Sequence, residues 1–197
     1  MPINNFLLPG AKTTPAYEVA NSCRFDRGSS ASMHITFSGA GDRQKFTFSF
    51  WVKRNKLGTQ EVIFDTNFGG GANEHRILFD SSDRLEFTDV TGGSVQAKLI
   101  TNRVFRDPHA WYHIVAVWDT ANTVSSERIK YYVNGQRQTD LNTQTLPSQN
   151  ADSGGAGRSG ANMRIGTYDY SGQFFDGYMA ELHYTDNYAY EPSEFGE

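Results

Sequence analysis

The sequence predicts an all-β chain that folds as two antiparallel sheets packed into a sandwich. Short runs alternate between apolar and polar residues or are apolar throughout, and Gly, Asn, Asp and Ser break these runs. No long stretch shows the 3.6-residue apolar period of a helix. Many short strands at this spacing are typical of β-sandwiches, and 197 residues suit a single domain.

The clearest predicted strand covers residues 46–53. Its apolar side chains occupy alternate positions, so they share one face: Phe46, Phe48, Phe50 and Val52. Residues 111–118 are apolar on both faces instead, which is typical of a central strand covered above and below. We therefore expect residues 111–118 to run through the core.

A hairpin is predicted around Asn134 and Gly135. Both central residues of a type I′ turn need positive φ, and Asn-Gly adopts it at low cost. Residues 127–133 lead into this turn and residues 136–139 leave it. Further strands are predicted at residues 21–25, 34–37, 62–65, 76–79, 84–88, 95–99, 163–166 and 178–184.

Three segments are predicted as loops, at residues 68–74, 142–160 and 167–177. Loops of this length in a compact domain more often carry function than not. Residues 1–17 lack a strand pattern, so we expect an extended N-terminal arm followed by one domain at residues 18–197.

The composition excludes several classes of protein. The net charge of −4 is spread along the chain, which argues against nucleic-acid binding. No apolar stretch is long enough to cross a bilayer, and residues 1–10 lack the features of a secretory signal peptide, so no membrane insertion is expected. The single Cys23 is expected to be buried or half-buried in a strand, and synthesis in a reducing cytoplasm is expected.

The motifs that resemble catalytic signatures lack the context that the chemistry needs. Gly155, Gly157 and Gly160 spell GxGxxG, but no strand precedes them and no helix follows, which favours a mobile loop. His109 and His113 suit zinc only on a helix, so ordinary sheet-edge histidines are expected. Because neither a GxSxG elbow nor the ExDxxE signature of sandwich-fold glucanases is present, we expect no enzymatic activity.

The segment at residues 167–176 is the candidate glycan-binding site. Sugar recognition needs flat aromatic rings beside amide or carboxylate groups, and this loop combines both: Tyr168, Asp169, Tyr170, Gln173 and Phe174. The alternative is that its rings only cap the edge of the sandwich.

Calcium binding is a second possibility, because oxygen ligands can come from separate loops. The candidate ligands are Asp65, Asp119, Asp169 and Asp176, which we place in loops or at strand ends. None belongs to a contiguous calcium motif, so solvated loop carboxylates are favoured over a metal site.

Five blocks of the sequence resemble the concanavalin A-like, laminin-G-like jelly-roll domains of tailed-phage virion proteins, particularly those of marine and cyanobacterial phages. The blocks are FLLPGAKTT (residues 6–14), FWVKR (50–54), VFRDPHAWYHIVAVWDT (104–120), YVNG (132–135) and FFDGYMAELHYTD (174–186). The resemblance implies a jelly roll whose first and last strands lie side by side, pairing residues 21–25 or 34–37 with residues 178–184.

The resemblance also implies a function. It indicates a non-catalytic surface module of a virion, made in the host cytoplasm, which binds host surface glycans or adheres as part of a tail fibre. Contacts with other virion proteins and assembly into a homo-oligomer are expected with it. The alternative is a structural virion protein (decoration, cement or fibre spacer) that binds only other virion proteins; a glycoside hydrolase or lyase is the third hypothesis.

Overall fold

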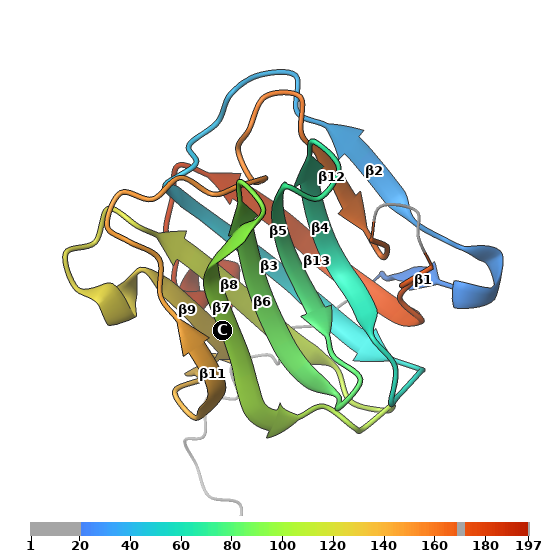
Figure 1. The fold of residues 1–197 in the computed structure, drawn as a ribbon. Helices are drawn as coiled ribbons and strands as arrows, with labels where there is room; N and C mark the ends of the chain where they lie inside the picture. The colour runs from blue at the N-terminus through green and yellow to red at the C-terminus, as the bar shows by residue number, and fades with distance from the viewer. Residues whose placement is uncertain (1–20, 169–171, 197) are drawn as a thin grey trace, which may run out of the picture.

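The computed structural model describes residues 21–168 and 172–196 and forms a sandwich of two antiparallel sheets. Figure 1 shows the two sheets packed face to face. The predicted all-β, two-sheet jelly-roll class is confirmed. The predicted arm at residues 1–17 lies outside the described residues, so the boundary at residue 18 stays a prediction.

The six-stranded sheet contains, in spatial order, β1 (Cys23–Phe25), β13 (Gly177–Asp186), β3 (Lys45–Arg54), β8 (Tyr112–Asp119), β9 (Ile129–Val133) and β10 (Gln136–Arg137). The seven-stranded sheet contains β11 (Leu141–Thr145), β7 (Ser94–Val104), β6 (Arg84–Thr91), β5 (Asn73–Phe79), β4 (Glu61–Phe68), β12 (Asn162–Ile165) and β2 (Met33–Thr36). Three short 3-10 helices complete the described elements: η1 (Arg27–Ser29), η2 (Ser125–Glu127) and η3 (Pro192–Phe195). Within the described ranges, none of the helices has the length and apolar character that crossing a membrane requires.

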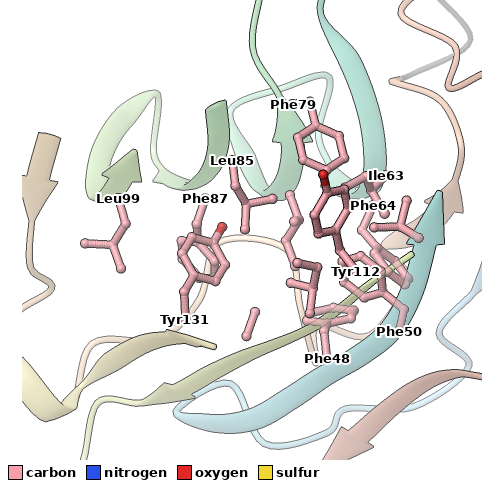
Figure 2. Close-up of a cluster of buried hydrophobic side chains, with 14 of the residues drawn as sticks. Phe48, Phe50, Ile63, Phe64, Phe79, Leu85, Phe87, Leu99, Tyr112 and Tyr131 are labelled. Carbon is pink, nitrogen blue, oxygen red and sulfur yellow. The ribbon is translucent and has the colours of Figure 1, made fainter. Parts of the chain in front are cut away.

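The core lies between the sheets and is rich in aromatic side chains. The alternating residues of β3 are buried there, as predicted, with Phe48 and Phe50 packed against Phe64 of β4 at ring-centroid distances of 4.8 and 5.2 Å. Figure 2 shows these rings beside Phe87 and Tyr131, which extend the cluster.

β8 runs through the middle of the six-stranded sheet and is buried on both faces, as the sequence predicts. One face contributes Ile114 and Trp118 to the core. The other face presents Val115 and Val117, which pack under the C-terminal segment through residues such as Phe195. β8 is apolar on both faces because the opposite sheet covers one face and the C-terminal segment covers the other.

The first and last described strands lie side by side, as the resemblance implies. β1 pairs with β13 through Cys23 opposite Met179 and Phe25 opposite Gly177. The other candidate for this place, at residues 34–37, forms β2 at the edge of the opposite sheet.

The segment predicted as one long loop at residues 142–160 differs from that prediction in two ways. It begins within β11, a polar edge strand paired with β7. Residues 153–157 are also buried, so they do not form an exposed loop. A Cβ on Gly154 would lie 1.8 Å from the Val90 carbonyl oxygen, and one on Gly155 would lie 2.3 Å from that of Thr66. These glycines therefore allow close packing of backbone on backbone.

Two further predictions were wrong. The Cys23 thiol is exposed, because β1 is a three-residue strand at the edge of its sheet. His113 is buried in the central strand β8, where its Nε2 lies 2.8 Å from the Ser49 hydroxyl, so it is not a sheet-edge residue.

Candidate functional site

The outer face of the seven-stranded sheet carries a row of charged side chains across β12, β4 and β5. Arg164 lies opposite Asp65, and Asp65 lies opposite Arg76. The Arg164 Nη1 lies 3.2 Å from Asp65 Oδ2, and the Arg76 Nη2 lies 3.1 Å from Glu74 Oε1. Neighbouring positions in these strands point into the core, so this row faces away from it.

Asp65 is a buried member of this row and not a strand-end residue, contrary to the sequence prediction. Burial, together with the nearby Glu74 carboxylate, raises the pKa of Asp65 to about 7, although Arg164 and Arg76 oppose the shift. The neutral form of Asp65 is therefore kept to a higher pH than that of an ordinary aspartate.

Tyr168 lies over this charged row. It follows β12 in the chain, and its ring centroid is 4.9 Å from the Arg76 guanidinium carbon. Its hydroxyl extends toward the β4–β5 loop, 3.4 Å from where a Cβ on Gly71 would be. The side chain is half-buried, and burial with the neighbouring Glu74 raises the pKa of the Tyr168 phenol. The Arg76 guanidinium, with Glu74 nearby, therefore holds the Tyr168 ring against the outer face of the sheet.

The next row of the same face is polar, with Thr36 exposed, Asn162 half-buried and Asn67 buried. Asn162 of β12 pairs with Asn67 of β4, and its side-chain oxygen accepts a hydrogen bond of 2.7 Å from the Thr36 hydroxyl. The same face of the sheet therefore carries an aromatic ring over a partly exposed guanidinium group and, on β12 and β2, amide and hydroxyl groups.

The loop that carries Tyr168 is closed at its base. Gly166 donates a backbone hydrogen bond to Ile63 of β4, and Phe175 donates one back to Gly166. Gln173 and Phe174 are half-buried on the returning part of the loop, where the Gln173 carbonyl accepts from the Val62 amide.

Of the five predicted glycan-binding residues, Tyr168 lies over the charged row and two lie on the returning part of the same loop. Asp169 and Tyr170 lie outside the described residues. A role of all five in sugar binding stays a prediction. Sequence reasoning missed Glu74, Arg76 and Arg164, although charged residues that alternate with apolar core positions in a strand are the signal that could have found them.

The candidate calcium ligands that the structure describes do not converge. Asp119 ends β8 opposite Lys45 at one end of β3, whereas Asp176 precedes β13 beside Asn55 at the other end. Asp65 belongs to the opposite sheet, and Asp169 lies outside the described residues. Across residues 21–168 and 172–196, no group of three or more His, Cys, Asp or Glu side chains is placed to hold a metal ion. The described candidates therefore do not form one calcium site.

Two acidic residues, Glu61 and Asp83, bind one buried arginine, Arg54. Arg54 Nη2 lies 2.9 Å from Glu61 Oε2 and 3.1 Å from Asp83 Oδ1, and its guanidinium lies over the Phe79 ring. Both carboxylates are buried. Because a glycosidase needs carboxylates that reach the substrate, this cluster suits a structural role.

A comparison with protein families assigns the fold to a known group. The profile of the concanavalin A-like lectin/glucanases superfamily matches residues 27–193. The chain belongs to this superfamily. No curated protein sequence matches this concanavalin A-like domain.

Solved structures share the same fold at low sequence identity. Domains LG4-5 of the mouse laminin alpha1 chain align with a TM-score of 0.60 and 13% identity over 95% of this chain and 47% of that one. The CBM40 of the Ruminococcus gnavus IT-sialidase, bound to alpha2,3 sialyllactose, aligns with a TM-score of 0.54 and 12% identity over 83% of this chain and 93% of that one. Domain 4 of the Geobacillus stearothermophilus GH43 arabinanase AbnA, in complex with arabinotriose, aligns with a TM-score of 0.53 and 19% identity over 83% of this chain and 69% of that one. At these identities the likeness concerns the fold.

Proposed function

We propose that this domain is a non-catalytic glycan-binding module whose contact surface is the outer face of the seven-stranded sheet around Tyr168. The observation that carries the proposal is the Tyr168 ring held over Arg76, on the same sheet face as the exposed Thr36 and the half-buried Asn162. Membership of a superfamily of concanavalin A-like lectins and glucanases supports it, as do two structural neighbours that hold bound oligosaccharides.

The chemistry of this face suits a sugar. An aromatic ring packs against the apolar C–H face of a pyranose, while amide, hydroxyl and guanidinium groups bind the hydroxyls at its rim. The ion pairs of Arg164 with Asp65 and of Arg76 with Glu74 hold the strands beneath Tyr168 in place before the sugar arrives. Such preorganisation lowers the entropic cost of binding.

A glycan array tests this proposal with three matched variants. We expect Tyr168→Ala to lose most of the signal and Tyr168→Phe to keep most of it, since the ring remains. Tyr188→Ala removes a tyrosine that is 54% exposed and lies beyond β13, so it should bind like the parent chain. Equal binding by all variants would overturn the assignment of this face, and no binding by the parent chain to any glycan would overturn the function.

We further propose that the module is displayed on a tailed-phage virion as a tail-fibre or adhesive element, in a homo-oligomer and in contact with other virion proteins. The resemblance of the five sequence blocks to virion proteins supports this placement. Repetition would strengthen sites that are individually weak. Immunogold labelling of intact particles tests it: label at an exposed fibre tip supports host contact, and label on particles only after dissociation supports the alternative of a structural cement or spacer.

A further inference from the structure

A cavity of about 290 Å³ lies at one end of the sandwich, between the connection from β2 to β3 and the last residues of β13. Two aromatic rings form part of its wall: Phe37, which follows β2, and Tyr184 of β13, with ring centroids 5.6 Å apart. Asp186, the last residue of β13, adds a carboxylate to the same wall. The cavity therefore combines apolar rings with one acidic group.

The walls of this cavity are joined by backbone hydrogen bonds. The Gly41 amide donates to the Gly157 carbonyl over 2.8 Å, and the Phe37 amide donates to the Ala161 carbonyl over 3.0 Å. Figure 1 shows the connection from β2 to β3, in blue, crossing this end of the sandwich beside the orange connection that leads into β12. A cavity with fixed walls loses little conformational freedom when a ligand binds.

The carboxylate of Asp186 is held in place but is not neutralised. Its Oδ1 accepts a hydrogen bond of 2.8 Å from the Asp42 amide, and the side chain is exposed. A Cβ on Gly41 would lie 2.7 Å from both carboxylate oxygens, so a glycine at this position lets Asp186 lie against the connection. Within residues 21–168 and 172–196, neither Asp186 nor Asp42 forms an ion pair with an arginine, lysine or histidine.

The arginine that neighbours the cavity in the sequence is already bound elsewhere. The Arg43 Nη1 lies 3.0 Å from Asp152 Oδ2, and its Nε and Nη2 donate to the Ser153 carbonyl. Burial and the two carboxylates at the cavity raise the pKa of the Tyr184 phenol. The wall of the cavity therefore carries negative charge that the described part of the chain does not compensate.

We propose that this cavity binds the guanidinium group of an arginine side chain from a partner protein. The guanidinium donates to the Asp186 carboxylate, and its planar face stacks on the rings of Phe37 and Tyr184. Among basic side chains, arginine suits the site because its guanidinium is weakly hydrated and packs on aromatic faces.

The size and the lining of the cavity favour one side chain over other ligands. Its volume of about 290 Å³ lies below the range of roughly 300–1,000 Å³ that is typical of small-molecule sites. A calcium ion needs six or more oxygen ligands, whereas no group of three or more His, Cys, Asp or Glu side chains in the described ranges is placed to hold a metal. Tyr168 does not line this cavity, so the proposal does not depend on glycan binding.

A titration followed by amide NMR tests the chemistry of recognition on the full chain. We expect the peptide Ac-Gly-Arg-Gly-NH2 to shift the amide signals of Gly41, Asp42 and Gly157. The same peptide with citrulline in place of arginine keeps the shape but lacks the charge, so at equal concentration its shifts should be roughly fivefold smaller. Equal shifts from both peptides, or shifts spread over the whole surface, would overturn the proposal.

Three variants then test the assigned residues. Asp186→Asn keeps an oxygen for the Asp42 amide but removes the charge, so it should weaken binding of the arginine peptide about fivefold. Tyr184→Phe keeps the ring and should change the affinity by less than about twofold. Asp107→Asn is the matched control and should bind like the parent chain, because its side chain is 61% exposed and also accepts a backbone hydrogen bond of 2.8 Å, but does not line the cavity.

The outcomes separate recognition at the cavity from general attraction to an acidic protein. Unchanged affinity in Asp186→Asn, or the same loss in Asp107→Asn, would overturn the proposal. The amide spectrum of each variant reports whether it is folded, and the comparison of the two peptides on the parent chain holds even if a variant is not.

Discussion

Substituting Asp89 with alanine should release the buried segment at residues 153–157 from the end of the sandwich. Asp89 lies on β6, and its Oδ2 is 2.9 Å from His75 Nδ1 and 2.6 Å from the Ser153 hydroxyl. Its Oδ1 accepts a hydrogen bond of 3.1 Å from the Gly154 amide. His75, Asp89 and Ser153 are all fully buried. One carboxylate therefore fixes a segment that lies far away in the sequence.

The expected magnitude follows from these contacts. Removing the carboxylate leaves three buried donors without their acceptor, and each unsatisfied buried donor costs about 1–3 kcal/mol. Because the Ser153 hydroxyl can reorient, we expect a total loss of about 3–5 kcal/mol in the free energy of unfolding. For a chain of this length, that corresponds to a fall in melting temperature of roughly 6–20 °C.

Urea unfolding followed by tryptophan fluorescence measures this loss, and Asp152→Ala is the matched control. Asp152 lies in the same segment, but its ion pair with Arg43 is solvent-exposed, so its loss should cost less than about 1 kcal/mol. Asp89→Ala should also make residues 151–157 a new site of limited proteolysis. If Asp89→Ala costs no more than Asp152→Ala, the anchoring role of Asp89 is wrong.

Two further predictions concern the buried charges. The pKa of Asp65 is about 7 in the folded chain against 3.8 for an ordinary aspartate, so the folded state holds the extra proton between these values and the free energy of unfolding falls as pH rises through this range. Relative to Asp65→Asn, pH titration of the parent chain's stability should show an additional fall of roughly 3 kcal/mol from pH 4 to pH 7, and parallel profiles would contradict the pKa shift. Arg54→Met leaves the buried carboxylates of Glu61 and Asp83 without their shared partner, and should cost about 3–5 kcal/mol in urea unfolding. Arg106→Met removes an arginine whose side chain is 61% exposed and should cost less than about 1 kcal/mol, so similar costs would refute the structural role of Arg54.

The strands with strong apolar patterns were predictable from the sequence. The alternation in β3 and the two apolar faces of β8 reflect burial that any packing of two sheets requires. β11 was missed because it is a polar edge strand that pairs with β7 on one side and has no fully buried side chain. A pattern of buried residues cannot indicate a strand that buries few side chains.

The candidate site was only partly predictable for a related reason. Tyr168 could be chosen for its chemistry, because it stands in an aromatic and polar loop. The charged row formed by Asp65, Arg76 and Arg164 comes from three strands that are separated in the sequence. Only the register of these strands brings the three side chains together. Asp65 was misplaced at a strand end because an acid inside a strand becomes understandable only once its arginine partner is known.

The measurement that tests the central claim most directly is a crystal structure of the full chain with the strongest glycan from the array. The account predicts a sugar ring in van der Waals contact with the Tyr168 ring, with its hydroxyls reaching the side chains of Arg76 or Asn162. A sugar bound on the six-stranded sheet or at the edge near β13 would contradict the claim, as would an array on which the parent chain binds nothing.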